Sequence, residues 1–162
     1  VLGFFLSMYN TWRQKEADLR AERREKESKQ RELQTEFSQL KQEGLLLCLE
    51  LQFAYNQQKS ILTEPLREAE QNHFPDIVAV LKEAVKHCDD RIATSKKSVE
   101  DFIALNPNYV NQEILLSLRE AVTGVRAENS ILSEGLRAHE AVAQEKLENI
   151  RERLASRSPQ QH

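Results

Sequence analysis

The stretch that decides the fold reads LQTEFSQLKQEGLLLCLELQFAYNQQKSI, residues 33–61. Side chains suited to a core recur along it in steps of three and four, the spacing that keeps them on one face of an α-helix. When this spacing is sustained over many residues, it predicts helices packed side by side in coiled-coil fashion. The predicted stripe consists of Leu33, Phe37, Leu40, Gly44, Leu47, Leu51, Ala54, Gln58 and Ile61.

Two further segments carry the same spacing, and prolines mark the breaks between them. Residues that precede a proline are pushed out of the α region, so Pro75 and Pro107 lie where helices are expected to end. We predict a first helix from about Met8 to Gln71, which could kink at Pro65. The stripe of the second segment is Val78, Leu81, Val85, Cys88, Ile92, Ser95, Val99 and Phe102. The stripe of the third is Leu115, Leu118, Val122, Val125, Asn129, Leu132, Leu136, His139, Ala143 and Ile150.

The predicted fold class is all-α. The chain has 162 residues with only four glycines and four prolines, and no alternating pattern of the kind found in strands. We expect an elongated antiparallel three-helix bundle or coiled coil with a long N-terminal stalk helix close to a membrane. The predicted regions are an apolar plug or end of a membrane segment (1–12), a charged helical stalk (13–32), a bundle (33–157, with helices 33–71, 76–105 and 109–157) and a disordered tail (158–162).

The apolar plug, residues 1–12, begins with VLGFFLSMY. It is too short to cross a bilayer, which takes about 20 apolar residues, but it could form the last turns of a membrane helix that starts before Val1. Aromatic residues gather at membrane interfaces, and basic residues mark the cytoplasmic side. We therefore expect an inner-membrane protein with its helical domain in the cytoplasm, or alternatively a cytoplasmic protein whose plug docks on another protein. The candidate membrane-interface residues are Phe4, Phe5, Tyr9, Trp12, Arg13 and Lys15.

The charged stalk that follows has no apolar face. Residues 13–31 contain eight basic and five acidic side chains. Glutamates precede bases by four residues in several places, and each such pair stabilises a helix by about 0.2–0.5 kcal/mol. This pattern is typical of a solvated helix. The expected pairs are Glu16–Arg20, Glu22–Lys26, Glu25–Lys29 and Glu27–Arg31.

Residues 44–55, GLLLCLELQFAY, are apolar on nearly every face of a helix. Such a helix is expected to be buried all round. Two neighbouring helices of the same chain would cover two sides, so the remaining side predicts a partner, most simply a second copy. An ordinary three-helix core with a wide middle is the alternative.

The lengths of the helices predict their register. A short turn near residues 71–76 makes the first two helices antiparallel, so that facing residue numbers sum to about 147. Cys48 and Cys88 then lie about 16 Å apart along the axis and stay free thiols. The third helix is expected to extend about 25 Å past the end of the bundle. This free overhang should begin near His139. The candidate oligomer and packing residues are Leu45, Leu46, Leu49, Phe53, Leu147, Ile150 and Leu154.

The sequence carries few residues suited to catalysis. His87, Cys88, Asp89 and Asp90 are ligand-type residues, but consecutive positions on a helix point in different directions. Phosphate-binding and nucleophile motifs are absent from the sequence. We predict no catalytic, cofactor-binding or metal-binding residue, no cofactor and no small-molecule substrate. Asn129 on the third stripe is interpreted as a polar residue that fixes register, with ligand binding as the alternative.

Net charge is −3, and acids alternate with bases along the stalk, so nucleic acid is not an expected partner. Two cysteines suit a reducing compartment. The function predicted from the sequence is a non-enzymatic, membrane-anchored helical scaffold or signalling module that self-associates or binds a helical partner protein. A soluble coiled-coil adaptor is the first alternative. A helical-bundle enzyme or metal-binding protein comes third, because ligand pairs are missing.

Overall fold

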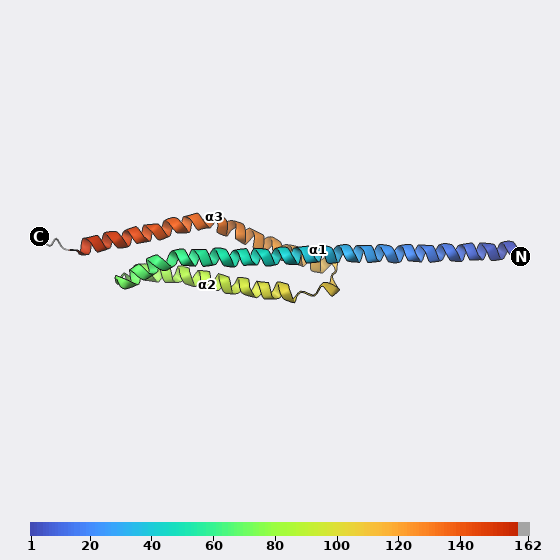
Figure 1. The fold of residues 1–162 in the computed structure, drawn as a ribbon, viewed down its shortest axis with the longest axis horizontal. Coiled ribbons are helices and arrows are strands. Elements are labelled where there is room, and N and C mark those ends of the chain that lie inside the picture. The colour runs from blue at the N-terminus through green and yellow to red at the C-terminus, as the bar shows by residue number, and fades with distance from the viewer. Residues whose placement is uncertain (159–162) are drawn as a thin grey trace.

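The computed structural model describes residues 1–158, nearly all of which are helical. Its helices are α1 (Leu2–Gln71), α2 (Pro75–Ala104) and α3 (Gln112–Arg157), with a short 3-10 helix, η1 (Pro107–Tyr109), before α3. α1 is a long rod along which α2 runs antiparallel and α3 runs parallel (Figure 1). The predicted all-α bundle with a long first helix is confirmed. Most of the predicted tail, residues 159–162, lies outside the described residues.

The connections between helices have ordinary caps. At the end of α1, His73 takes the left-handed conformation with φ 58°, and the amide of Phe74 donates to the carbonyl of Ala69 at 3.0 Å. A hydrogen bond between an amide and the carbonyl five residues earlier, next to a left-handed residue, closes the C-terminus of many helices. α3 begins after Asn111, whose side chain accepts a hydrogen bond from the amide of Ile114 at 2.8 Å. The third helix therefore starts at Gln112, close to the predicted start at about Tyr109 or Asn111.

The core lies along one seam of α1. Within the seam, Gly44 lets the ring of Phe102 approach so closely that an added Cβ would lie 2.6 Å from it. Leu47, Ala54 and Ile61 of the predicted stripe are only half-buried, because the seam moves by one position as the helix turns. The buried residues of α1 are Phe37, Gly44, Cys48, Leu51, Tyr55, Gln58, Leu62, Pro65 and Ala69.

The antiparallel register of α1 and α2 agrees with the predicted one. Lys59 forms an ion pair with Asp89 at 2.6 Å, and the hydroxyl of Ser95 donates to the carbonyl of Cys48 at 2.8 Å. The numbers of these facing residues sum to 148 and 143, close to the predicted 147. Cys48 and Cys88 are both buried free thiols. α1 continues through Pro65 without ending, and it bends over its last turns (Figure 1).

The predicted overshoot of the third helix, about 25 Å, is much too long. Near its C-terminus, Arg153 binds Asp76 at 2.9 Å and Arg157 donates to the carbonyl of Asn72 at 2.9 Å, so only the last turns of α3 pass the turn between α1 and α2 (Figure 1). Ile150, placed on the free overhang by the prediction, is 1% exposed and belongs to the core.

The conformation of residues 105–111 explains this difference. Lys41 contacts the carbonyls of Ile103 and Leu105 at 3.1 Å, whereas Gln30 donates to the carbonyl of Val110 at 3.4 Å. From residue 41 back to residue 30, α1 covers about 16 Å. The backbone is extended at Leu105, Asn106, Val110 and Asn111, with only η1 between them, so the segment advances along α1 instead of turning tightly. α3 therefore begins far nearer the N-terminus of α1 than a tight turn would allow.

The N-terminal part of α1 stands alone. Residues 2–29, here called the projecting segment, continue past α2 and α3 as a single helix (Figure 1). Except for the half-buried Glu16, every residue of this segment is exposed. It comprises most of the plug and nearly all of the stalk.

Candidate interaction surfaces

The plug is an amphipathic helix rather than a uniformly apolar one. Gly3, Ser7, Asn10 and Thr11 follow one another in helical spacing and share one side. The large apolar residues occupy the remaining arc of about 200°, at 3.6 residues per turn. All of them are exposed; Trp12, for example, is 60% exposed. The sequence contains this spacing of small and polar residues. The amphipathic character was not predicted because nearly all of the first nine residues are apolar.

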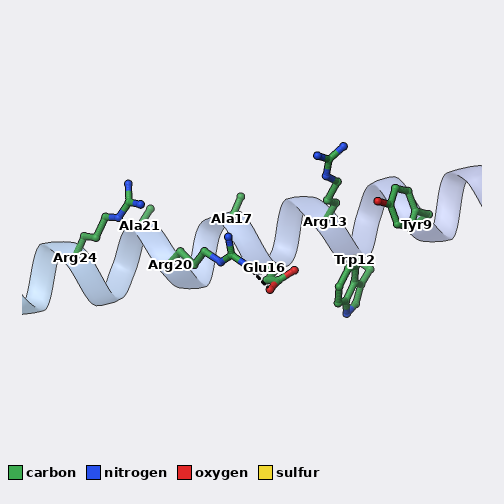
Figure 2. Close-up of a pocket in the computed structure, with 8 residues that line it drawn as sticks. All are labelled: Tyr9, Trp12, Arg13, Glu16, Ala17, Arg20, Ala21 and Arg24. Atoms are coloured by element: carbon green, nitrogen blue, oxygen red, sulfur yellow. Dashed lines mark hydrogen bonds and ion pairs between the residues drawn. The ribbon is translucent and has the colours of Figure 1, made fainter.

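An aromatic and basic face spans the end of the plug and the start of the stalk. The rings of Tyr9 and Trp12 lie 6.3 Å apart, and the guanidinium of Arg13 lies 6.0 Å from the centre of the Tyr9 ring, at the limit of a cation–π contact. Lys15 is also exposed, about 160° away from Arg13 around the helix. The predicted membrane-interface residues are therefore exposed, but they do not share one face. A shallow hollow of about 490 Å³ lies along this part of the helix. Figure 2 shows the side chains that line it: Tyr9, Trp12, Arg13, Glu16, Ala17, Arg20, Ala21 and Arg24.

Ion pairs within the stalk largely follow the predicted spacing. Arg20 binds Glu16 at 2.7 Å and Lys29 binds Glu25 at 2.7 Å. The hydrogen bond from Lys29 lowers the pKa of Glu25. Lys26 lies 3.7 Å from Glu22, whereas the expected pair of Glu27 and Arg31 is absent from the described residues. These local pairs support the helix where no tertiary contact does.

The side of α1 for which the sequence predicts a partner is exposed to solvent. Leu46, Leu49 and Phe53 form an exposed stripe, here called the α1 patch, on the face opposite the buried seam. Phe53 is 65% exposed. Leu45 is half-buried and packs against the core. At the other predicted surface, Leu147 is half-buried and Leu154 packs beside Ile150, so these α3 residues serve the chain's own packing.

A groove between α2 and α3 was not predicted from the sequence. Its floor is Gln58 of α1, which is 4% exposed and whose Oε1 has no hydrogen-bond partner among the described residues. One hollow of this groove has a volume of about 510 Å³. Within it, Glu128 accepts a hydrogen bond from Tyr55 at 3.1 Å and pairs with Arg91. Two features of the sequence could have indicated this groove: Gln58, a polar residue on the predicted buried stripe, and the glycines of the third helix.

The polar residues singled out in the sequence do not assemble into a reactive site. His139 lies with Nδ1 2.8 Å from the carbonyl of Gly135, and the neighbouring His87 is exposed. Burial raises the pKa of both the Cys48 and Cys88 thiols, which disfavours the reactive thiolate. No cluster of three or more metal-ligand residues occurs within residues 1–158.

Asn129 is half-buried at the edge of the α1–α3 interface, and its role in fixing register stays a prediction. Its Nδ2 donates to Oε2 of Glu50 at 2.7 Å, which joins α3 to α1 in one alignment. On either side of this bond, Arg119 pairs with Glu36 and Arg126 pairs with Glu43. These contacts all lie at the edge of the α1–α3 interface.

Across the part of the chain that the structure describes, no helix combines the length and the apolar character needed to span a membrane. Comparison with known proteins found no family model, no curated protein and no solved structure that matches this chain.

Proposed function

We propose that this protein is a non-enzymatic helical scaffold that acts by self-association. The observation that carries the proposal is the projecting segment, a lone helix of 28 residues that ends in exposed aromatic and aliphatic side chains. A helix without tertiary partners has only marginal stability in water. Contiguous exposed apolar surface is characteristic of an interaction site.

The energy available from covering the plug is comparable with the cost of association. Fully burying one Leu, Phe or Met side chain is worth about 1.5–3 kcal/mol. Burial of four such side chains would therefore supply about 6–12 kcal/mol. Loss of translational and rotational freedom on association costs about 4–15 kcal/mol, which is of the same size as this gain.

The rigid rod gives the protein the geometry of a scaffold. The α1 patch is a second exposed apolar surface on the same helix as the plug. Residues 8 and 49 lie about 60 Å apart along that helix, at 1.5 Å per residue. A single continuous helix thus carries two exposed apolar surfaces, the plug and the α1 patch, at a defined separation.

Analytical ultracentrifugation across a range of concentrations tests the proposal. We expect a species heavier than the 18.8 kDa monomer, growing with concentration. Replacing Phe4 and Phe5 by glutamine should weaken this association, whereas replacing Ser7 and Asn10 by glutamine on the small, polar side should leave it unchanged. A chain that stays monomeric at every concentration contradicts the proposal.

A second candidate function is attachment to a membrane surface. The specific observation in its favour is the apolar arc of the plug followed by Trp12, Arg13 and Lys15, a combination typical of helices that lie at a lipid interface. The bundle would then stand at the cytoplasmic face of the inner membrane, because basic residues are attracted to the anionic lipids of that leaflet.

Flotation with anionic and with zwitterionic vesicles tests this second candidate. Binding should be stronger to the anionic vesicles and should weaken as salt rises. Each base near such a surface is worth about 1 kcal/mol, so replacing Arg13 and Lys15 by glutamine should weaken binding by up to about 30-fold. Replacing Arg119 and Arg126, which lie on the bundle, by glutamine is the matched control, because it removes the same charge away from the plug. A chain that floats with neither vesicle type rules this function out.

A further inference from the structure

α2 and α3 both pack along α1, and their backbones seldom approach each other. Ion pairs between Arg91 and Glu128 and between Asp76 and Arg153 join them. Hollows follow one another along the line between them, with volumes of about 470, 510 and 650 Å³. Residues from α2 and from α3 line each of them. The three helices therefore leave room alongside α1 for part of a fourth.

The α3 wall of the groove is suited to a close helix. Gly124, Ala127 and Gly135 line the middle hollow. A Cβ added at Gly124 would meet nothing within 4 Å, so the small side chain there is not required by the chain's own packing. Small residues at a contact allow two helix axes to come nearest one another.

The floor of the groove lacks a hydrogen-bond donor. Gln58 lines two of the hollows, and its buried Oε1 is unpartnered within residues 1–158. Buried polar atoms of this kind are normally satisfied. Trp12 is the only tryptophan of the chain; its indole N–H is a donor, and its side chain is exposed.

The seam of α1 continues into the projecting segment. Counting back from Leu33 in steps of three and four reaches Leu19, Trp12, Tyr9 and Phe5. The intervening positions are Gln30, Lys26, Arg23 and Glu16. In the bundle this seam packs against α2 and α3, whereas in the projecting segment nothing covers it.

The lengths of the two parts match. α2 has 30 residues and is about 45 Å long, and the projecting segment has 28 and is about 42 Å long. If two copies lie antiparallel with their α1 helices fully overlapped, facing residue numbers sum to about 73. Each projecting segment then runs beside the α2 of the other copy. The two copies make identical contacts, as in a dimer with two-fold symmetry. Trp12 falls opposite residue 61, within a turn of Gln58.

The charges are complementary. Residues 13–31 carry eight basic and five acidic side chains, a surplus of three positive charges, so the rest of the chain carries −6 against the total of −3. Glu83, Asp101 and Glu113 line the groove, and in the described residues none of them has a basic group within 4.0 Å. A positive helix and a negative groove favour association and set its orientation.

From these observations we infer that the projecting segment of a second copy occupies the groove between α2 and α3, antiparallel to α1, with Trp12 donating to Gln58. The two copies form a closed dimer in which each groove receives the partner's helix. This inference rests on the self-association proposed above and names the surfaces that carry it.

Trp12 fluorescence and molar mass, measured together on the full chain, test the inference. As concentration rises, the mass should approach twice 18.8 kDa and stop there, because the contact is closed. The emission of Trp12 should shift to shorter wavelength in step with the mass, because the indole leaves water. Dimerisation should weaken as salt rises.

A variant that closes the groove gives the sharper test. Gly124→Leu fills the space meant for the partner but meets no atom of its own chain at Cβ, and leucine is a better helix former than glycine. We expect native helicity and a dimer dissociation constant raised at least about tenfold, the scale of an overpacked contact. Ser130→Leu, at an exposed position of α3 outside the groove, is the matched control and should dimerise like the parent.

The outcomes separate this inference from the proposed function. A monomer at all concentrations overturns both. A dimer that survives Gly124→Leu, with Trp12 emission unchanged on association, leaves self-association intact and overturns the groove contact. A dimer weakened equally by Gly124→Leu and Ser130→Leu also overturns it, because the effect is then not specific to the groove.

Discussion

Gly44 and Gly124 provide a matched pair of substitutions that tests the packing of the bundle. Both lie inside helices, so alanine at either position gains about 0.5–1 kcal/mol from the reduced flexibility of the unfolded chain. Their surroundings differ. A Cβ at Gly44 would lie 2.6 Å from Cε1 and Cζ of Phe102, whereas a Cβ at Gly124 meets no atom within 4 Å.

The close contact at Gly44 cannot be relieved cheaply. The Phe102 ring is 6% exposed and belongs to the core cluster around Phe37, so it has little space into which to move. Overpacking of this kind costs about 1–3 kcal/mol. Gly44→Ala should therefore lower the free energy of unfolding by up to about 2.5 kcal/mol, after the helix gain is subtracted. Gly124→Ala should raise it by about 0.5–1 kcal/mol.

Urea denaturation followed by circular dichroism gives both free energies, at a concentration low enough to avoid association. The difference between the two variants isolates the steric cost, about 1–3 kcal/mol, because the helix term cancels. That difference corresponds to about 2–12 °C in Tm for a chain of this size. In a Phe102→Leu background, the cost of Gly44→Ala should shrink. Equal stability of the two alanine variants would refute the close approach of Phe102 to Gly44.

Three further predictions concern single groups. Gln58→Leu should raise the free energy of unfolding of the monomer by about 1–3 kcal/mol, measured by urea denaturation, because an unpartnered buried oxygen is removed; a loss of stability would show that the oxygen is satisfied in the monomer. The hydrogen bond from Arg153 lowers the pKa of Asp76 from its usual 3.8, so its contribution is present above that pH and is lost as pH falls through the lowered pKa. The stability difference between the parent and Arg153→Gln, followed by acid titration of the unfolding free energy, should shrink over that range, and a difference independent of pH would contradict this. Cys48 and Cys88 should react with a thiol reagent only upon unfolding, and mass spectrometry of non-reduced protein should find no bond between them; prompt reaction of the folded chain would contradict their burial.

The fold could be predicted because its main determinants are local. The steps of three and four along residues 33–61 report directly which side of a helix is apolar, and the structure buries that side with Phe37, Gly44 and Leu51 on it. The register of α1 against α2 followed from equal rise per residue on either side of a short turn. The exposed α1 patch was also foreseeable, since one chain supplies only two neighbours for a helix that is apolar all round.

The register of α3 could not be predicted in the same way. It depends on the path of residues 105–111, and a linker of that length can either fold into a tight turn or extend by about 3.3 Å per residue. Nothing in the spacing of apolar residues distinguishes these paths, because α3 presents the same stripe to α1 at any shift of a whole heptad. The bonds from Arg153 to Asp76, at the start of α2, and from Arg157 to Asn72, at the end of α1, select one shift.

The sequence by itself therefore determined the helices, their buried faces and the antiparallel pairing of the first two, because each is set by contacts close along the chain. Only the tertiary structure decided where α3 begins, that Ile150 is buried, and that α2 and α3 stand apart over Gln58. These features arise between segments distant in sequence, where the path of a linker and the separation of two helices decide what meets. A pattern of apolar residues records which face is buried, but it does not record how far apart two covering helices lie.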